Sequence, residues 1–318
     1  MNKAMLLRLH RWVTFAFMVP IAAVIATGLV LSVEPIAHYA AVEPGTLNAD
    51  HINELLERHD PGGQARALTF RPYDGMLLIA GVRPRPPLAV ALGTGKEVSG
   101  GATWSDVFLT SRRLHETLLL DLGWLVVAST CAMLALTVLG VLMGLPRLRN
   151  SLAGWHKGVA WGLLPFLVAS PLTGLFVAYG VTFASVPAAG PSVTPSLREA
   201  VRVVQDAGHD LSGLVWLRTQ GGRMLARLSE GGEWRLYVVT QDGAVPQPRN
   251  WPRLLHEGNF AGIWSGLLNV VISLALIGLL VTGLTLWARR TVLLRQRRRP
   301  VEKQAPLFSR KRSIRTPT

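Results

Sequence analysis

The chain has 318 residues, of which 49% are hydrophobic, with a mean hydropathy of +0.32 and a formal net charge of +14. Apolar residues gathered in blocks at this density exclude an ordinary soluble globular protein and predict an integral membrane protein. The charge does not indicate nucleic-acid binding, because eleven Lys or Arg against one acid, Glu302, lie from Arg289 to the end, and this tail contains no recognisable nucleic-acid-binding module.

Four apolar stretches predict membrane-spanning helices. The first, Trp12–Val33, follows Arg8 and Arg11. A cleaved signal peptide is its alternative, but the stretch is longer than an h-region of roughly 7 to 15 residues, which favours a retained helix. The other three lie between Asp121 and Arg147, after His156 within the uncharged run Gly158–Leu197, and over Gly258–Ala288. Each is long enough to cross a hydrocarbon core of about 30 Å.

Basic residues flank the N-terminus, the short loop between the second and third stretches, and the C-terminus. The positive-inside rule therefore predicts cytoplasmic termini and two long segments on the outer side of a bacterial inner membrane. The predicted division is a first transmembrane helix in 1–35, an outer domain in 36–113, a second helix in 114–146, a cytoplasmic loop in 147–154, a third helix in 155–185, an outer domain in 186–254, a fourth helix in 255–290 and a basic cytoplasmic tail in 291–318.

The two outer segments have matching patterns of a helix followed by three strands. The first helix should start at Asn48, and the second at Thr194-Pro195-Ser196, with the proline in its first turn. The predicted strands are Ala67–Phe70, Met76–Gly81, Leu88–Leu92, Gly213–Leu217, Met224–Leu228 and Trp234–Val239. The fold class is therefore a mainly α membrane protein, with four spans in two pseudo-symmetric halves, each carrying a small outer α+β domain.

Four histidines stand at ends of the predicted spans in a repeated pattern. Thr-Gly-Leu follows both His10 and His156 at the same distance, and Leu-His-Glu occurs at both His115 and His256, before the second and fourth spans. Such repetition indicates an internal duplication. Topology sorts the histidines into a cytoplasmic pair, His10 and His156, and an outer pair, His115 and His256.

Paired imidazoles on facing helices are a suitable ligand set for haem iron. The only cysteine, Cys131, lies in an apolar stretch, so a thiolate cluster and c-type haem attachment are excluded. We therefore predict two haems b, with these four histidines as cofactor-binding residues and iron ligands. One haem near each membrane face would provide an electron path across the bilayer.

Other interpretations of the histidines remain open. Each ring is also an ordinary anchor at the headgroup boundary. Glu116 and Glu257, beside the outer histidines, provide for a His/carboxylate site for iron or zinc, although this alternative leaves the cytoplasmic pair unexplained. His38, His51, His59 and His209 have no matched partner, and we predict that they are solvated residues of the outer domains.

The chain resembles the PepSY-associated transmembrane proteins over roughly Met5 to Arg290. The resemblance rests on the order and spacing of Leu9-His10-Arg11-Trp12, Leu114-His115-Glu116, Trp155-His156-Lys157 and Leu255-His256-Glu257-Gly258. It implies PepSY-like outer domains and, for some members, di-haem reductases that release Fe(II) from ferric siderophores. It also implies a different possibility, a non-enzymatic anchor that displays PepSY domains to a peptidase or assembly factor.

The expected partners follow from this reading. They are membrane lipid, a ferric siderophore or other ferric chelate on the outer side, and a quinol or a separate cytoplasmic reductase as electron donor, because the sequence has no Gly-rich dinucleotide fingerprint. No nucleic acid is expected. Arg11 and Lys157, beside the cytoplasmic histidines, either neutralise haem propionates or only set the topology.

Overall fold

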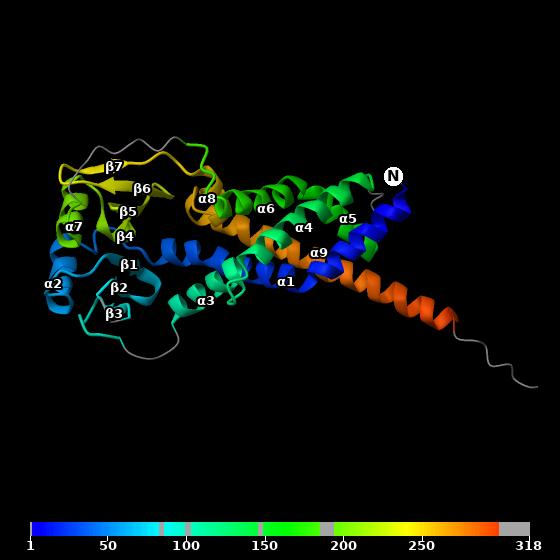
Figure 1. Cartoon of the computed structure of the whole chain (residues 1–318), viewed down its shortest axis with the longest axis horizontal. Coiled ribbons are helices and arrows are strands. Elements are labelled where there is room, and N and C mark those ends of the chain that lie inside the picture. Colours follow the sequence, from blue (N-terminus) through cyan, green and yellow to red (C-terminus); the bar gives the residue numbers. More distant parts are fainter. Residues whose placement is uncertain (1, 83–85, 99–102, 146–148, 185–193, 299–318) are drawn as a thin grey trace, which may run out of the picture.

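A computed structural model of the chain describes residues 2–82, 86–98, 103–145, 149–184 and 194–298. It consists of an elongated helical bundle with a β-sheet lobe at one end (Figure 1). The two longest helices, α1 (Lys3–Ala41) and α9 (Gly262–Arg298), pack against each other along the bundle. The N-terminus lies at the end away from the sheet. Arg147 and the part of the predicted tail in 299–318 fall outside the described residues.

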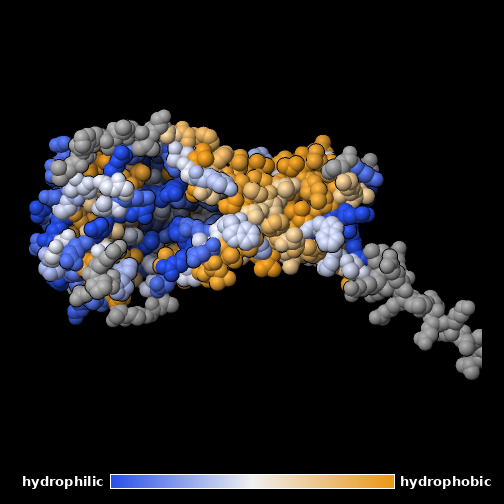
Figure 2. Space-filling model, viewed as in Figure 1, coloured by the Kyte–Doolittle hydropathy of each residue, from blue (hydrophilic) through white to orange (hydrophobic). Residues whose placement is uncertain are grey.

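Among the described residues, three helices are long and apolar enough to cross a membrane, namely α1, α4 (Gly123–Leu142) and α9 over its first 31 residues. Their apolar side chains point outward, and Val19, Val138 and Val281 are each more than half exposed. Figure 2 shows a hydrophobic surface over the bundle beside a hydrophilic sheet lobe. Such a surface is stable against lipid and not against water. The chain is therefore a mostly helical membrane protein with an attached β-sheet.

The uncharged stretch after His156 is not one straight helix. It contains α5 (Leu152–Gly162) and α6 (Leu164–Ala178), whose axes bend by 63°. Pro165, in the first turn of α6, explains the break, because proline has no N–H to donate and disfavours helical geometry at the residue before it. The helix ends at Ala178, and Gly180 follows with a φ of +68°, so the helix stops well before Leu197.

Two shorter helices precede the second and fourth apolar helices. A capping box of Thr103 and Asp106 starts α3 (Trp104–Thr117), and the side chain of Asn250 caps α8 (Trp251–Glu257). Each of these helices carries one of the predicted outer histidines near its C-terminal end. These histidines are therefore on separate helices beside the apolar ones and not in the first turn of a span.

The two outer segments form a single antiparallel sheet in the strand order β3-β2-β1-β4-β5-β6-β7. They join where Leu68 of β1 (Ala67–Arg71) pairs with Leu217 of β4 (Leu214–Gln220). The other strands are β2 (Met76–Ala80), β3 (Leu88–Ala91), β5 (Arg223–Glu230), β6 (Glu233–Val239) and β7 (Ala244–Pro246). Six strands stand where the sequence predicts them. The prediction missed β7, which has only three residues and ends in a proline.

One face of the sheet is covered by two amphipathic helices, α2 (Ala49–His59) and α7 (Leu197–Asp206). Asn48 caps α2 as predicted. Ser196 caps α7 in a capping box with Glu199, so Pro195 lies before the helix and its predicted place in the first turn is wrong. The shared core includes Ile52, Leu68, Val201 and Leu217, none more than 1% exposed. The opposite sheet face is turned toward the helical bundle.

We predict that Leu217→Ala destabilises the whole lobe by about 2–5 kcal/mol, the usual cost of truncating a core leucine. Because β4 is hydrogen-bonded to β1, both halves of the sheet should unfold in one transition at a lower midpoint. Denaturant unfolding followed by tryptophan fluorescence measures this. Val245→Ala, at a half-exposed position on the edge strand, is the control and should change little. Two separate unfolding transitions would contradict the shared core.

Candidate functional site

The structure brings two of the four predicted histidines into direct apposition. His115 of α3 and His256 of α8 have ring centroids 6.1 Å apart, with their planes inclined by 45°. They come from opposite halves of the chain and meet at the end of the bundle next to the sheet lobe.

The Nδ1 atoms of both rings are held by backbone carbonyls of apolar helices. Nδ1 of His115 lies 3.0 Å from the carbonyl oxygen of Val24 in α1, and Nδ1 of His256 lies 3.2 Å from that of Ser170 in α6. A carbonyl only accepts, so each Nδ1 must carry the proton and donate it. This fixes the tautomer in which Nε2 keeps its lone pair, the form in which histidine binds a metal.

A threonine and a glycine complete each of these sites. Oγ1 of Thr27 lies 3.1 Å from Nδ1 of His115, and Oγ1 of Thr173 lies 3.5 Å from Nδ1 of His256. A Cβ added at Gly28 would lie 3.3 Å from Cε1 of His115, and one at Gly174 only 2.9 Å from Cε1 of His256. In each case the helix supplies a backbone carbonyl, then a threonine three residues later, then a glycine. We call this arrangement a histidine socket.

A third histidine socket holds His156 of α5 against α9. Nδ1 of His156 lies 2.7 Å from Oγ1 of Thr282, whose hydroxyl donates to the carbonyl of Gly278. The hydroxyl oxygen is then the acceptor, so His156 also carries its proton on Nδ1. A Cβ at Gly283 would lie 3.5 Å from Cε1 of this ring. Thr282-Gly283-Leu284 is thus a third copy of the Thr-Gly-Leu pattern, and it was visible in the sequence.

His10 occupies the fourth position and differs from the others. Its ring faces the backbone of Leu136 in α4, but Leu139 stands where the other sockets have threonine, and Nδ1 is buried without a hydrogen-bond partner in the described chain. Nothing lies within 4 Å of a Cβ added at Gly140. His10 is near enough for its charge to act on the ring of His156. Of the four rings, His10 is therefore the one least firmly held.

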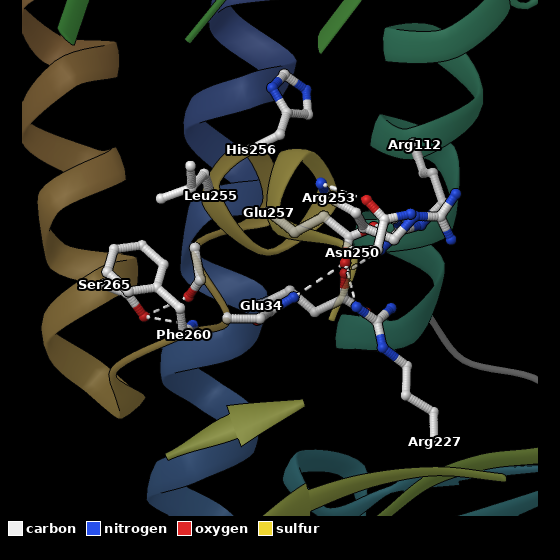
Figure 3. A network of polar contacts seen from close by, with 12 residues as sticks. Glu34, Arg112, Arg227, Asn250, Arg253, Leu255, His256, Glu257, Phe260 and Ser265 are labelled. Atoms are coloured by element: carbon white, nitrogen blue, oxygen red, sulfur yellow. Dashed lines mark hydrogen bonds and ion pairs between the residues drawn. The ribbon is translucent and has the colours of Figure 1, made fainter. Parts of the chain in front are cut away.

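Charged side chains link the outer pair to the sheet (Figure 3). An arginine stands three residues before each outer histidine, so the repeated motif is Arg-x-Leu-His-Glu. Arg112 of α3 pairs with buried Glu34 of α1, which also accepts from Arg71 of β1 at 3.0 Å. Arg253 of α8 lies 3.8 Å from Glu257. Sequence analysis missed these arginines because it treated single basic residues as topology signals.

The carboxylate of Glu257 is paired with arginine side chains. Its carboxylate accepts from Arg227 of β5 at 2.6 Å. Burial acts to raise the pKa of Glu257, but Arg227, Arg253 and Arg112 together lower it below its ordinary value, so the side chain stays ionised. In the described part of the chain no three His, Cys, Asp or Glu side chains surround one point. The geometry thus gives little support to the alternative His/carboxylate metal site.

The prediction that His38 is solvated is wrong. Its side chain is 1% exposed and packs edge-on against Tyr39 and Trp234, with ring centroids 6.2 and 5.3 Å away. The cause is the length of α1, which continues through Pro35 to Ala41 and carries this ring beneath the sheet. His51, His59 and His209 are half-buried; Nδ1 of His209 lies 2.6 Å from Glu230.

Comparison with known proteins agrees with the sequence motifs. Residues 7–290 match the family described as the PepSY-associated TM region. The chain belongs to this family. The match spans the helical bundle and both segments of the sheet, so all four histidines of this PepSY-associated protein lie within the family region. No curated protein matches the chain.

We predict that Gly174→Ala displaces His256 from its socket, because the new methyl group would lie 2.9 Å from Cε1 of the ring. Overpacking of this kind costs about 1–3 kcal/mol. Thermal unfolding in detergent should show a lower midpoint. Gly140→Ala is the matched control, at an open position in α4, and should leave the midpoint unchanged. Equal effects of the two substitutions would show that the socket is not tightly packed.

Proposed function

We propose that this protein is a di-haem b electron-transfer protein that reduces a ferric complex, most simply a ferric siderophore, on the periplasmic side of the bacterial inner membrane and releases Fe(II). The observation that carries the proposal is the apposition of His115 and His256, with the Nδ1 of each ring engaged by an apolar helix.

The spacing of the outer rings fits a shared iron. Imidazole nitrogens bind a metal at about 2 Å, so two rings can share one metal only when they lie close together. The observed separation is 6.1 Å. His115 and His256 would hold one haem, and His10 and His156 the other. Bound haem supplies a one-electron carrier whose potential depends on its axial ligands, their hydrogen bonds and burial.

The arrangement of charge supports a layout of four spans in two halves, with the bent pair α5 and α6 counted as one span. The start of α1, helix α5 and the last part of α9 lie at the end away from the sheet (Figure 1), and these segments carry the following basic residues: Arg8, Arg11, Lys157 and Arg289. The positive-inside rule assigns that end to the cytoplasm. Both termini would then be cytoplasmic and the sheet lobe would stand on the outer side.

The two histidine pairs lie at different depths. His10 and the socket for His115, Val24 to Gly28, are both on α1, and at 1.5 Å per residue they are about 21–27 Å apart along the helix axis. The hydrocarbon core is about 30 Å thick. Cofactors at the two positions would span most of the insulating layer.

The roles of the chain's own residues follow from the sockets. The backbone carbonyls and threonines hold each imidazole in one tautomer, and the glycines let the ring approach the helix closely. Arg11 and Lys157 adjoin the cytoplasmic ligands, where they would either neutralise haem propionates or only set the topology. The electron donor would be a quinol or a separate cytoplasmic reductase, since the sequence has no dinucleotide fingerprint.

We predict that the protein purified from haem-replete cells shows a Soret band that shifts on reduction with dithionite. His115→Ala and His256→Ala should each remove the same half of the haem, and His10→Ala and His156→Ala the other half, because each pair shares one iron. Haem content by the pyridine haemochrome assay measures this, with His209→Ala as the control. A colourless preparation would instead favour the non-enzymatic anchor, and unequal losses within a pair would refute the pairing.

We also predict that Leu139→Thr lowers the midpoint potential of one haem. The new hydroxyl would give Nδ1 of His10 the acceptor that the other three rings have, and a stronger hydrogen bond raises the basicity of an axial imidazole and favours Fe(III). Spectroscopic redox titration measures both midpoints. The control Leu142→Thr places a hydroxyl at an exposed position of the same helix. A shift of both midpoints, or of neither, would contradict the assignment.

A further inference from the structure

The sheet face that α2 and α7 leave uncovered carries arginines from three strands. Arg71 of β1, Arg218 of β4 and Arg227 of β5 alternate along their strands with the core residues, so they point away from the α2/α7 side. Trp216 lies on the same face, in register with Thr69 and Arg227. Figure 2 shows a hydrophilic hollow between the sheet lobe and the bundle.

Two more arginines reach this region from the bundle. Arg112 and Arg253 stand on α3 and α8, one helical turn before the outer histidines. Arg253 lies 3.8 Å from Glu257, the same carboxylate that accepts a hydrogen bond from Arg227 of the sheet, so its side chain stands beside the sheet. We call the space bounded by the following residues the arginine cleft: Arg71, Arg112, Arg218, Arg227 and Arg253.

The arginine cleft has more positive charge than its carboxylates balance. Glu34 forms ion pairs with Arg71 and Arg112. Glu257 forms a close ion pair with Arg227 and lies 3.8 Å from Arg253. Within the described ranges, no carboxylate pairs with Arg218. Several guanidiniums gathered in a partly buried space repel one another, and the repulsion is relieved when an anion binds.

Arg218 shows this imbalance most clearly. Its guanidinium stacks on the Trp216 ring, 4.1 Å from the ring centroid, and its buried Nε has no hydrogen-bond partner in the described structure. Burial, Arg253 and Arg227 all lower the pKa of Arg218. The stacking holds the planar fork in one orientation, which is the arrangement that binds a carboxylate through two parallel hydrogen bonds.

We propose that the arginine cleft is the substrate site and that it selects polyanionic, carboxylate-bearing ferric chelates over neutral or cationic ones. This inference rests on the proposed function for its ferric substrate, but anion binding by the cleft does not depend on reduction. Arg253 and Arg112 place such a chelate next to His256 and His115.

The carboxylates that the cleft attracts have a second possible source, the propionates of a haem held by the outer histidines. Propionate binding would involve the arginines nearest the rings, Arg112 and Arg253. Arg218 lies on the sheet, and its substitution distinguishes the two sources. If Arg218 binds a propionate, the substitution changes haem binding or the haem spectrum. If it binds substrate, the haem stays unchanged.

The test uses the full-length, haem-loaded protein in detergent and gallium(III) citrate, a redox-inert polycarboxylate chelate, as the ligand in isothermal titration calorimetry. Arg218→Gln should weaken binding about tenfold, as expected for the loss of a charge-assisted hydrogen bond. Arg218→Lys keeps the charge and should lose less. Arg202→Gln, on the exposed surface of α7, removes the same charge from the other side of the sheet and should bind like wild type.

Equal affinities of Arg218→Gln and Arg202→Gln would overturn the proposal. Loss of haem or a shifted Soret band in Arg218→Gln would also overturn it and would assign the cleft to propionates. A neutral gallium(III) trihydroxamate that binds as tightly as the citrate complex would contradict the selectivity. If the protein proves colourless yet binds gallium(III) citrate through Arg218, the electron-transfer function fails and the anion site stands.

Discussion

The hydrogen bond from a histidine Nδ1 to an apolar helix is the interaction on which the site depends. A helix carbonyl in a hydrocarbon layer has no competing water, so its bond to an imidazole N–H is well protected. For His115 and His256 this bond fixes the tautomer and the direction of the ring, and for His156 the bond to the Thr282 hydroxyl does the same. The glycine one turn beyond the carbonyl makes the approach possible. Three rings are therefore held in position by the protein alone.

The sheet is the second element that brings the halves together. Pairing of β1 with β4 ties the two outer segments into one lobe, and the carboxylates of buried Glu34 and half-buried Glu257 tie that lobe to the helices that carry the outer histidines. Breaking such a buried ion pair leaves an uncompensated charge, which is strongly destabilising. The distance between His115 and His256 thus depends on the lobe as well as on the bundle.

Much of this arrangement could be predicted from the sequence because duplicated motifs and alternating strands leave clear periodic signals. The Thr-Gly pairs of the sockets are visible in the sequence, but their role is not, because a backbone carbonyl has no sequence signature and becomes an acceptor only through the packing of two helices. Pro35 and Glu34 together suggested a helix end, but the charge of Glu34 is matched by Arg71 and Arg112, and α1 continues to bury His38. The arginine cleft was hidden because its residues are dispersed over five elements.

Electron paramagnetic resonance of the oxidised protein tests the central claim most directly, because it reports the axial ligands of ferric haem without any substitution. Two histidine pairs that each hold one iron predict two low-spin ferric signals of the bis-imidazole type and no high-spin ferric haem. A dominant high-spin signal, or protein without haem iron, would contradict the account, since it would mean that these rings do not share a metal.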